Sequence, residues 1–291
     1  MVDILRKKRR MIMKVFFNGR IVNSDSPTIK ALDRGMTFGD GLYEVIKVVN
    51  GKFPFIKDHV GRLEKSSKFF KIKFEYNLDK IEAIAQELSS INKIESGELF
   101  LEITRGADTI RDHIFEKEYA PTFLEVVQPL RRIDANLWQT GAKLVTYPDM
   151  RHGLCEHKTI DLLPNVLAKN YAHSKGGYEA LMFRTKNGEK YVTEGGSSSY
   201  IFFDGEKIVA PKIDNILPSI TRSKVLSIAR SMGFEVIERR VWLDEVQRMK
   251  EVMLLSTVSK VMPVVKIDDM NFSFGSVTKK LMTAFEEMIS S

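Results

Sequence analysis

The sequence predicts a mixed α/β protein, more narrowly of the α+β kind, that folds as two domains. Its 291 residues are more than a single small core usually organises. Short strand-like runs that end in Gly-containing turns are interspersed with segments of helical period. The polar stretch Arg131–Gln139 has no clear period and separates two such sets. We therefore expect a basic extension at 1–12, a small α+β domain at 13–132, a linker at 133–139 and a larger domain at 140–291.

The small domain should begin with a β-hairpin, because Asn18-Gly19 separates two short strand-like runs. Three glycines between Leu32 and Tyr43 then indicate tight backbone turns beside a bulky group. The predicted strands are Lys14–Phe17, Arg20–Val22, Tyr43–Val49, Lys52–Ile56, Leu99–Thr104 and Thr122–Val127. The predicted helices are His59–Phe70 and Leu78–Ile91.

The larger domain should contain several short strands and three helices. Asn187-Gly188 and Asp204-Gly205 mark hairpin turns. The predicted strands are Lys143–Thr146, Glu179–Arg184, Lys190–Thr193, Tyr200–Phe203, Glu235–Arg239, Val252–Leu255 and Val261–Ile267. The predicted helices are one that follows Lys158, Ile220–Met232 with Ser219 as N-cap, and Val277–Ile289.

Composition excludes several classes of protein. One cysteine rules out an internal disulfide and fits a reducing compartment, so we expect a cytoplasmic protein. No apolar run is long enough to span a bilayer, and no membrane partner is expected. Four of the seven net positive charges lie in residues 1–12, which we interpret as a dispensable extension. A basic nucleic-acid-binding protein is the rival interpretation, but no binding motif supports it.

Lys158 is the first candidate for chemistry. It precedes a run in which Leu162, Leu163, Val166, Leu167 and Tyr171 recur at helical spacing, and which Thr159 or Asp161 could cap. At the mouth of a buried helix, desolvation would favour its neutral amine. A neutral amine can form a Schiff base with an aldehyde.

Other segments offer polar groups that suit a bound anion or ring. Glu194 opens the turn Glu194–Ser199, whose two glycines and three serines allow a close approach of the backbone. The free N–H groups of Ile220 and Thr221 at a helix start could bind an anion. The turn at Thr257 could add donors, and Arg62 could pair with a phosphate in bidentate fashion.

Taken in order, five motifs resemble the class IV (fold-type IV) aminotransferases, which use pyridoxal phosphate. They are Asp33–Gly51, Arg62, Lys158 with its helix, Glu194 with the glycines and serines that follow it, and Leu217–Thr221. The resemblance runs from about Lys14 to the C-terminus and implies a large domain of pseudo-barrel form. Lys158 would hold the cofactor covalently and act as general acid and base, and Glu194 would face the pyridine nitrogen. Arg62, Ile220, Thr221 and Thr257 would bind the phosphate. Leu217 would pack on the ring, and Ser198 would help to shape the pocket. No metal is expected.

Within that family, Arg111-Asp112-His113 resembles the Arg-x-His pair of D-amino acid aminotransferases. The resemblance implies that Arg111, His113 and Tyr43 bind the substrate carboxylate, with the Arg-x-His loop contributed across a homodimer interface. The expected reaction is ping-pong transamination between a D-amino acid, such as D-alanine, and a 2-oxo acid, such as 2-oxoglutarate. An L-branched-chain aminotransferase and a 4-amino-4-deoxychorismate lyase stay open as alternatives, because Gly196, Ser199 and Val258 depart from the subfamily pattern.

Overall fold

The computed structural model describes residues 12–130 and 132–290, so the predicted basic extension lies outside the described residues except for Ile12, which is exposed. The chain divides into two compact units, Met1–Pro129 (unit 1) and Leu130–Ser291 (unit 2). The division falls close to the polar stretch Arg131–Gln139, and helix α4 (Leu137–Thr140) begins inside that stretch. Among the described residues, no helix combines the length and the hydropathy that a bilayer crossing needs.

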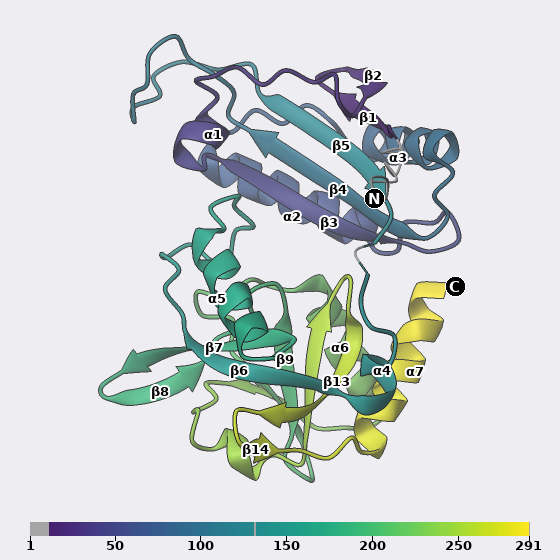
Figure 1. The fold of residues 1–291 in the computed structure, drawn as a ribbon, viewed down its shortest axis with the longest axis vertical. Helices are drawn as coiled ribbons and strands as arrows, with labels where there is room; N and C mark the ends of the chain where they lie inside the picture. The colour runs from purple at the N-terminus through teal and green to yellow at the C-terminus, as the bar shows by residue number, and fades with distance from the viewer. Residues whose placement is uncertain (1–11, 131, 291) are drawn as a thin grey trace, which may run out of the picture. The chain divides into compact units, whose positions relative to one another are not determined.

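Unit 1 is an antiparallel sheet of order β2-β1-β5-β4-β3, with α2 and α3 on one face (Figure 1). Its strands are β1 (Lys14–Phe17), β2 (Arg20–Asn23), β3 (Gly41–Val48), β4 (Gly97–Thr104) and β5 (Thr122–Gln128). Its helices are α1 (Arg34–Phe38), α2 (Ile56–Phe70) and α3 (Leu78–Asn92). The core between sheet and helices includes the fully buried Ile46, Leu88 and Leu101.

Most strands and helices predicted for unit 1 are confirmed, but the strand at Lys52–Ile56 is wrong. After the turn at Asn50-Gly51 only Lys52 pairs, in a single bridge with Val49. Pro54 cannot donate to a strand ladder, and Phe55 has a φ of 62° and stands at the N-cap of α2. The chain therefore leaves the extended conformation and enters α2 at once.

The glycine-rich stretch before β3 forms α1, a short helix that the sequence did not reveal. Asp33 caps it by accepting the N–H of Gly35 over 2.8 Å, and Gly39 ends it with a φ of 67°. A Cβ at Gly35 would overlap the side chain of Thr104. Gly39 therefore adopts the left-handed backbone conformation that ends the helix, and Gly35 allows the helix to lie close to β4.

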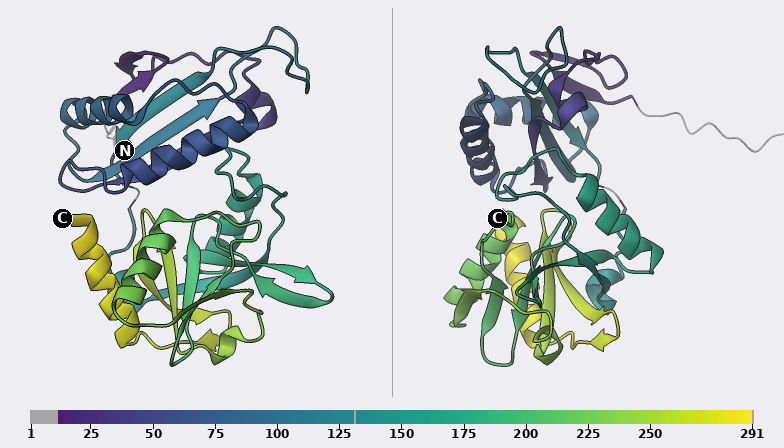
Figure 2. Two further views of the ribbon diagram at one scale, coloured as in Figure 1. Left: turned by 180° about the vertical axis from the view of Figure 1, so that it is seen from behind. Right: turned by 90° about the vertical axis from the view of Figure 1, so that its left-hand side faces the viewer.

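Unit 2 is a curled sheet of order β11-β10-β9-β12-β13-β6-β7-β8, with β14 paired to β13. Its strands are β6 (Ala142–Pro148), β7 (Glu179–Lys186), β8 (Glu189–Val192), β9 (Ser199–Phe203), β10 (Ile208–Pro211), β11 (Val236–Arg239), β12 (Glu251–Ser256), β13 (Lys260–Ile267) and β14 (Met270–Asn271). Besides α4, its helices are α5 (Leu163–Ser174), α6 (Ile220–Ser231), α7 (Ser276–Ser290) and the 3-10 turn η1 (Val246–Arg248). Figure 2 shows α6 and α7 packed side by side against the sheet.

The turns and the helix cap that were predicted for unit 2 from single residues are confirmed. Asn187 and Gly188 both have positive φ and join β7 to β8, and Asp204 begins the turn between β9 and β10. Ser219 caps α6 as predicted, since its hydroxyl accepts the N–H of Arg222 over 3.2 Å. Single residues with strong conformational preferences therefore identified these points correctly.

The prediction of a buried apolar face on the helix after Lys158 is wrong. The buried residues of α5 are Ala168 and Ala172, which pack on Ala180 and Met182 of β7. Small side chains let the helix lie close to the sheet. The larger apolar residues form an exposed stripe of Leu163, Val166, Leu167 and Tyr171, which are 66%, 50%, 45% and 40% exposed. The predicted caps are wrong as well, because Leu162 is the N-cap without a side-chain hydrogen bond and Pro164 pre-sets the first turn.

Candidate functional site

Glu194 is a buried carboxylate with two partners from distant segments. Its side chain follows β8 and the residue is 4% exposed. Oε1 accepts the backbone N–H of Leu217 over 3.0 Å and contacts Nη1 of Arg151. Burial raises the pKa of Glu194, and the charge and hydrogen bond of Arg151 offset part of that rise. One cation and one backbone amide therefore stabilise the charged form inside unit 2.

Arg151 and Asp149 complete this cluster, and the sequence reasoning missed both. Asp149 Oδ1 and Oδ2 accept from Nε and Nη2 of Arg151 over 2.9 and 2.8 Å, and the side chain of Asp149 is fully buried. Arg184 Nε lies 3.2 Å from Asp149 Oδ2. Burial raises the pKa of Asp149, but Arg151 and Arg184 hold it below its usual value. Opposite charges two residues apart, just after a strand, were the available signal.

The segment that carries Lys158 is attached on both sides to the other candidate segments of unit 2. Upstream, the N–H of Cys155 donates to Asn215 Oδ1 over 3.0 Å, just before Leu217. Downstream, Asn165 Nδ2 donates to the carbonyl of Gly196 over 2.9 Å. Lys158 itself lies outside regular secondary structure and is partly exposed. The fold therefore gathers three segments that are far apart in the sequence.

The candidate phosphate-binding residues of unit 2 lie at the start of α6 and in the turn after β12. Since α6 begins at Ile220, the N–H groups of Ile220 and Thr221 have no acceptor within the helix. Thr257 follows β12, in which Leu255 pairs with Ser199 of β9. The turn of Thr257 therefore lies at the strand end next to Ser198, which is 8% exposed.

The glycines after Glu194 are explained by close packing. A Cβ at Gly196 would lie 2.9 Å from Cγ of Lys169 and 3.0 Å from the carbonyl oxygen of Asn165, both on α5. Nζ of Lys169 donates to the Oγ of Ser197 over 3.0 Å and to the buried Glu179 over 2.8 Å. The crowded backbone expected here is confirmed, and it accommodates helix α5.

Arg62 lies in unit 1, where it binds a carboxylate. Its Nε and Nη2 donate to Oε1 and Oε2 of Glu44, both over 2.7 Å. His59 Nδ1 lies 2.7 Å from the same Oε2, and Glu44 is fully buried. Burial raises the pKa of Glu44, but the charge and hydrogen bonds of Arg62 and His59 outweigh it and lower the pKa to about 2. The phosphate role of Arg62 stays a prediction.

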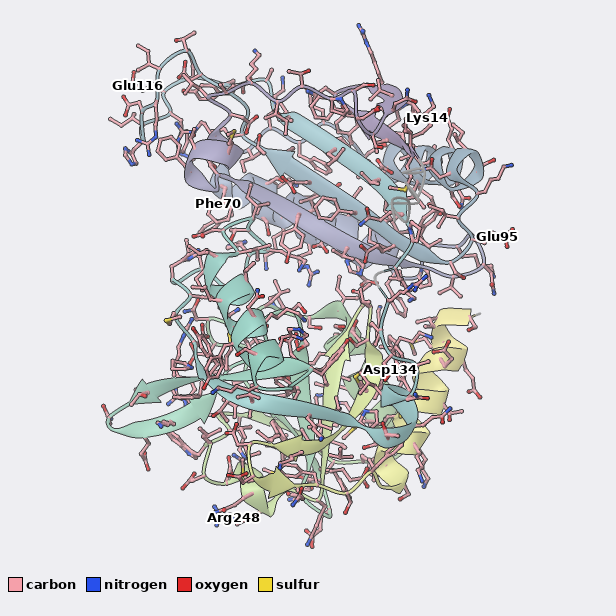
Figure 3. All side chains as sticks on the ribbon, in the orientation of Figure 1. Lys14, Phe70, Glu95, Glu116, Asp134 and Arg248 are labelled. Carbon is pink, nitrogen blue, oxygen red and sulfur yellow. The ribbon has the colours of Figure 1, made fainter. Side chains whose placement is uncertain are left out.

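Arg111 and His113 lie on an exposed loop of unit 1, residues 106–121, which extends beyond the sheet to the tip marked by Glu116 in Figure 3. The Arg111 guanidinium carbon is 4.4 Å from the ring centroid of Phe38, and the His113 ring is 4.8 Å from the same ring. Tyr43 lies on β3, with its ring 6.1 Å from that of Phe100. Phe38 therefore brings Arg111 and His113 together, whereas Tyr43 belongs to another element.

The residues of unit 2 fit pyridoxal phosphate, the cofactor that the resemblance implies. Glu194 offers a buried carboxylate for a pyridine nitrogen, and the start of α6 offers N–H groups for a phosphate. The hydrogen bond from Leu217 to Glu194 connects the segment that leads into α6 to this carboxylate. Lys158 supplies an amine on a segment fastened to both.

Comparison with known proteins identifies the family of the chain. Residues 41–267 match the model of the amino-transferase class IV family. The D-alanine aminotransferase of Bacillus licheniformis is 33% identical over 283 residues, which are 96% of this chain and 98% of that protein. The D-alanine aminotransferase of Staphylococcus aureus (strain N315) is 34% identical, with the same coverage.

A solved structure shows the same fold at lower identity. It is the branched-chain amino acid aminotransferase of Thermoproteus uzoniensis with norvaline, which has a TM-score of 0.85 and 21% identity and covers 96% of this chain and 95% of that chain. The predicted α+β fold of fold-type IV and the aminotransferase activity are confirmed. So is pyridoxal phosphate as the cofactor on which such enzymes depend. The chain belongs to the class IV aminotransferase family.

Proposed function

We propose that this enzyme moves an amino group between a D-amino acid, such as D-alanine, and a 2-oxo acid, such as 2-oxoglutarate, in a ping-pong cycle. Two D-alanine aminotransferases that match almost the whole chain support this assignment. The observation that carries it is the exposed loop on which Arg111 and His113 both pack against Phe38. A guanidinium and an imidazole side by side suit the recognition of one carboxylate.

The residues of unit 2 take the roles that hold the cofactor. Pyridoxal phosphate supplies an electron sink for the negative charge that develops at the substrate Cα. Lys158 binds the cofactor through its amine and moves the proton at Cα as general acid and base. Glu194 keeps a proton on the pyridine nitrogen, and its contacts with Arg151 and Leu217 favour the charge that this role needs.

The remaining groups orient the cofactor and the substrate. The phosphate is bound by Ile220, Thr221, Thr257 and Arg62. The side chain of Leu217 packs on the cofactor ring, and Ser198 shapes the pocket wall. Tyr43, Arg111 and His113 bind the substrate carboxylate. The resemblance to D-amino acid aminotransferases is the ground on which we propose a homodimer in which the loop of one copy serves the site of the other. The exposed apolar stripe on α5 supports such an association. The single cysteine supports a cytoplasmic location.

Absorption and kinetics test the proposal. The purified protein should carry a visible absorption band that Lys158→Ala abolishes, while Lys175→Ala, at the exposed end of α5, keeps it. Lys158→Ala should lower kcat by about 10²–10⁴-fold. A protein that kept the band and its activity without Lys158 would refute the assignment of the cofactor lysine.

A substrate panel tests the choice between D- and L-amino acids. D-Alanine with 2-oxoglutarate should react far faster than L-leucine or L-valine, and Arg111→Ala should raise the KM for D-alanine by at least about tenfold. Faster reaction of the L-amino acids would favour the branched-chain aminotransferase instead.

A solved 4-amino-4-deoxychorismate lyase of Pseudomonas aeruginosa also has this fold. It has 23% identity and a TM-score of 0.80, and the match covers 95% of this chain and 100% of that chain. Release of product from 4-amino-4-deoxychorismate without an oxo acid would favour that alternative.

A further inference from the structure

We infer that Arg34 is a positioning residue that sets the conformation of the Arg111–His113 loop. This inference rests on the proposed function, because it assigns a role to the residue that holds the substrate-binding loop. Arg34 is buried on α1, and the loop itself has no regular secondary structure. The backbone between Arg111 and His113 therefore depends on contacts from outside the loop.

Arg34 supplies those contacts with both ends of its guanidinium fork. Nη1 donates to the carbonyl oxygen of Asp112, and Nη2 donates to that of His113 over 3.0 Å. Two hydrogen bonds to consecutive carbonyls fix the peptide between them in position and orientation. The planar fork is suited to this, whereas the ammonium of a lysine is a single point of contact. The Arg34 guanidinium carbon also lies 4.8 Å from the ring centroid of Phe38, the ring that contacts both Arg111 and His113.

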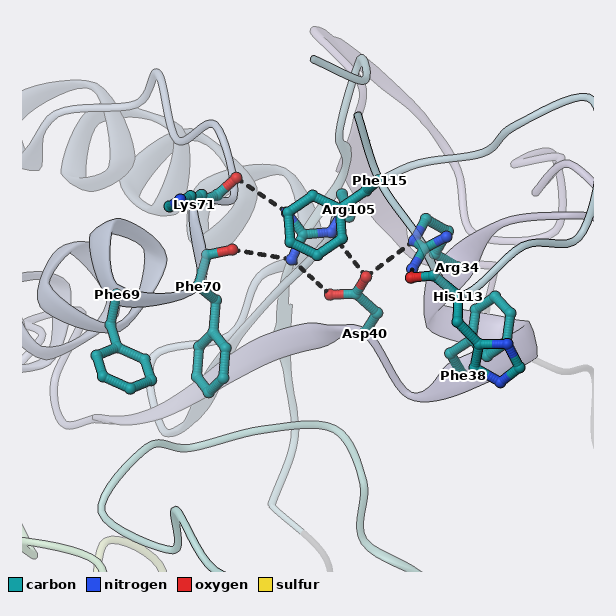
Figure 4. Close-up of a pocket in the computed structure, with 9 residues that line it drawn as sticks. All are labelled: Arg34, Phe38, Asp40, Phe69, Phe70, Lys71, Arg105, His113 and Phe115. Atoms are coloured by element: carbon teal, nitrogen blue, oxygen red, sulfur yellow. Dashed lines mark hydrogen bonds and ion pairs between the residues drawn. The ribbon is translucent and has the colours of Figure 1, made fainter. Parts of the chain in front are cut away.

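Asp40 and Arg105 fix the position of the Arg34 side chain on the side away from the loop. Asp40 Oδ2 accepts from Nε of Arg34 over 2.9 Å and from Nε of Arg105 over 2.7 Å. Arg105 is anchored in turn to the end of α2, because Nη2 and Nη1 donate to the carbonyls of Phe70 and Lys71, each over 2.9 Å. Figure 4 shows this chain of contacts, with Asp40 between the two arginines. The contacts connect the end of α2 to the exposed loop.

The same residues line a cavity of about 610 Å³, together with Phe69, Phe70, Lys71, His113 and Phe115. Four of its lining residues, Phe38, Phe69, Phe70 and Phe115, are aromatic. Phe115 contributes mainly through its ring, which lies 3.8 Å from the guanidinium carbon of Arg105. Elsewhere in the loop, Asp108 accepts from Lys117 Nζ over 3.0 Å and from the Tyr119 hydroxyl over 2.7 Å. These contacts do not reach the carbonyls of Asp112 and His113, which accept the two hydrogen bonds from Arg34.

Kinetics and hydrogen exchange of three variants test the inference. Arg34→Gln should raise the KM for D-alanine by about tenfold and change kcat by less than about threefold, with Arg34→Lys in between. Amide exchange of residues 107–118 should become faster in Arg34→Gln without substrate. Asp40 keeps its bidentate partner Arg105 in this variant, so no buried carboxylate is left unpaired. The control Thr37→Ala removes a hydrogen bond to the Asp33 carbonyl on the same helix but no loop contact, and should change neither quantity.

A further variant separates this inference from the proposed function. If Arg34 acts through the loop, adding Arg34→Gln to a chain that already carries Arg111→Ala and His113→Ala should cost little more in kcat/KM. If Arg111→Ala leaves the KM for D-alanine unchanged, the proposed carboxylate site fails, and loop exchange still reports on Arg34. If Arg111→Ala raises the KM but Arg34→Gln alters neither KM nor exchange, the positioning role alone is overturned.

Discussion

The backbone N–H of Leu217 donates to Oε1 of Glu194 over 3.0 Å. This hydrogen bond joins the segment before α6 to the turn after β8, although the two residues are far apart in the sequence. Arg151 contacts the same oxygen. A backbone amide and a cation therefore hold the carboxylate that we propose faces the pyridine nitrogen of the cofactor.

Replacing Glu194 by Gln tests whether its charge is required. An amide oxygen can still accept from Leu217, but the variant cannot balance a protonated pyridine nitrogen. We expect kcat for D-alanine with 2-oxoglutarate to fall by about 100-fold or more. Thermal melting should show that the variant folds, and Glu189→Gln, at an exposed site on β8, should behave as wild type. A Glu194→Gln enzyme of nearly normal kcat would contradict the role of the charge.

Glu125 predicts an unusual dependence of stability on pH. It is fully buried in β5, neither carboxyl oxygen has a hydrogen-bond partner among the described residues, and burial raises its pKa from 4.5 to about 9 despite the charge of Lys80. The folded state therefore keeps a proton that the unfolded state releases above pH 4.5. The contribution to stability should fall by on the order of 1 kcal/mol per pH unit between these two values.

The variant Glu125→Met should remove that slope and raise the free energy of unfolding, because it eliminates a buried polar group without partners. Urea unfolding at pH 6 and pH 8.5 measures the effect, and the gain over wild type should be larger at pH 8.5. Glu82→Met, at an exposed position of α3, provides the control. Equal gains at both pH values would indicate that Glu125 is ionised in the folded protein.

Arg62→Met should destabilise unit 1 whether or not Arg62 also binds phosphate. It leaves the buried Glu44 with His59 as its remaining ion-pair partner among the described residues, and breaking a buried pair costs about 3–5 kcal/mol. The double variant Glu44→Gln/Arg62→Met should recover much of that loss in urea unfolding. If the folded double variant also binds the cofactor normally, the phosphate role of Arg62 is wrong.

The same pair predicts a loss of stability in acid. Because the pKa of Glu44 is lowered from 4.5 to about 2 in the folded state, its contribution is complete above pH 4.5 and disappears as the pH falls toward 2. The double variant lacks this group, so its unfolding free energy should fall less over that window. Parallel pH curves for the two proteins would refute the ion pair.

The apolar stripe of α5 should mediate association of two copies. Val166→Glu places a charge in the middle of the stripe, where it would be desolvated on assembly, so sedimentation should shift from dimer toward monomer. Ile91→Glu is the matched control, because Ile91 is 45% exposed on α3, outside the stripe. A Val166→Glu protein that sediments as wild type would exclude this face from the interface.

The sequence alone determined the features that depend on local chemistry. Asn18-Gly19 and Asn187-Gly188 located two hairpins, and Ser219 located the start of α6. Hydrophobic period and turn residues located most strands. The ordered motifs between Asp33 and Thr221 were sufficient to identify the family. These signals act over a few residues, so they can be read without knowledge of the fold.

Only the tertiary structure decided which side chains meet and which faces are buried. The helix after Lys158 looked amphipathic in the expected sense, but Ala168 and Ala172 face the sheet while Val166 and Leu167 remain exposed. The partners of Glu194, Glu44 and Asp40 come from segments that no spacing rule connects. Burial and charge pairing are properties of the packed chain, because a side chain's neighbours are set by how distant elements pack.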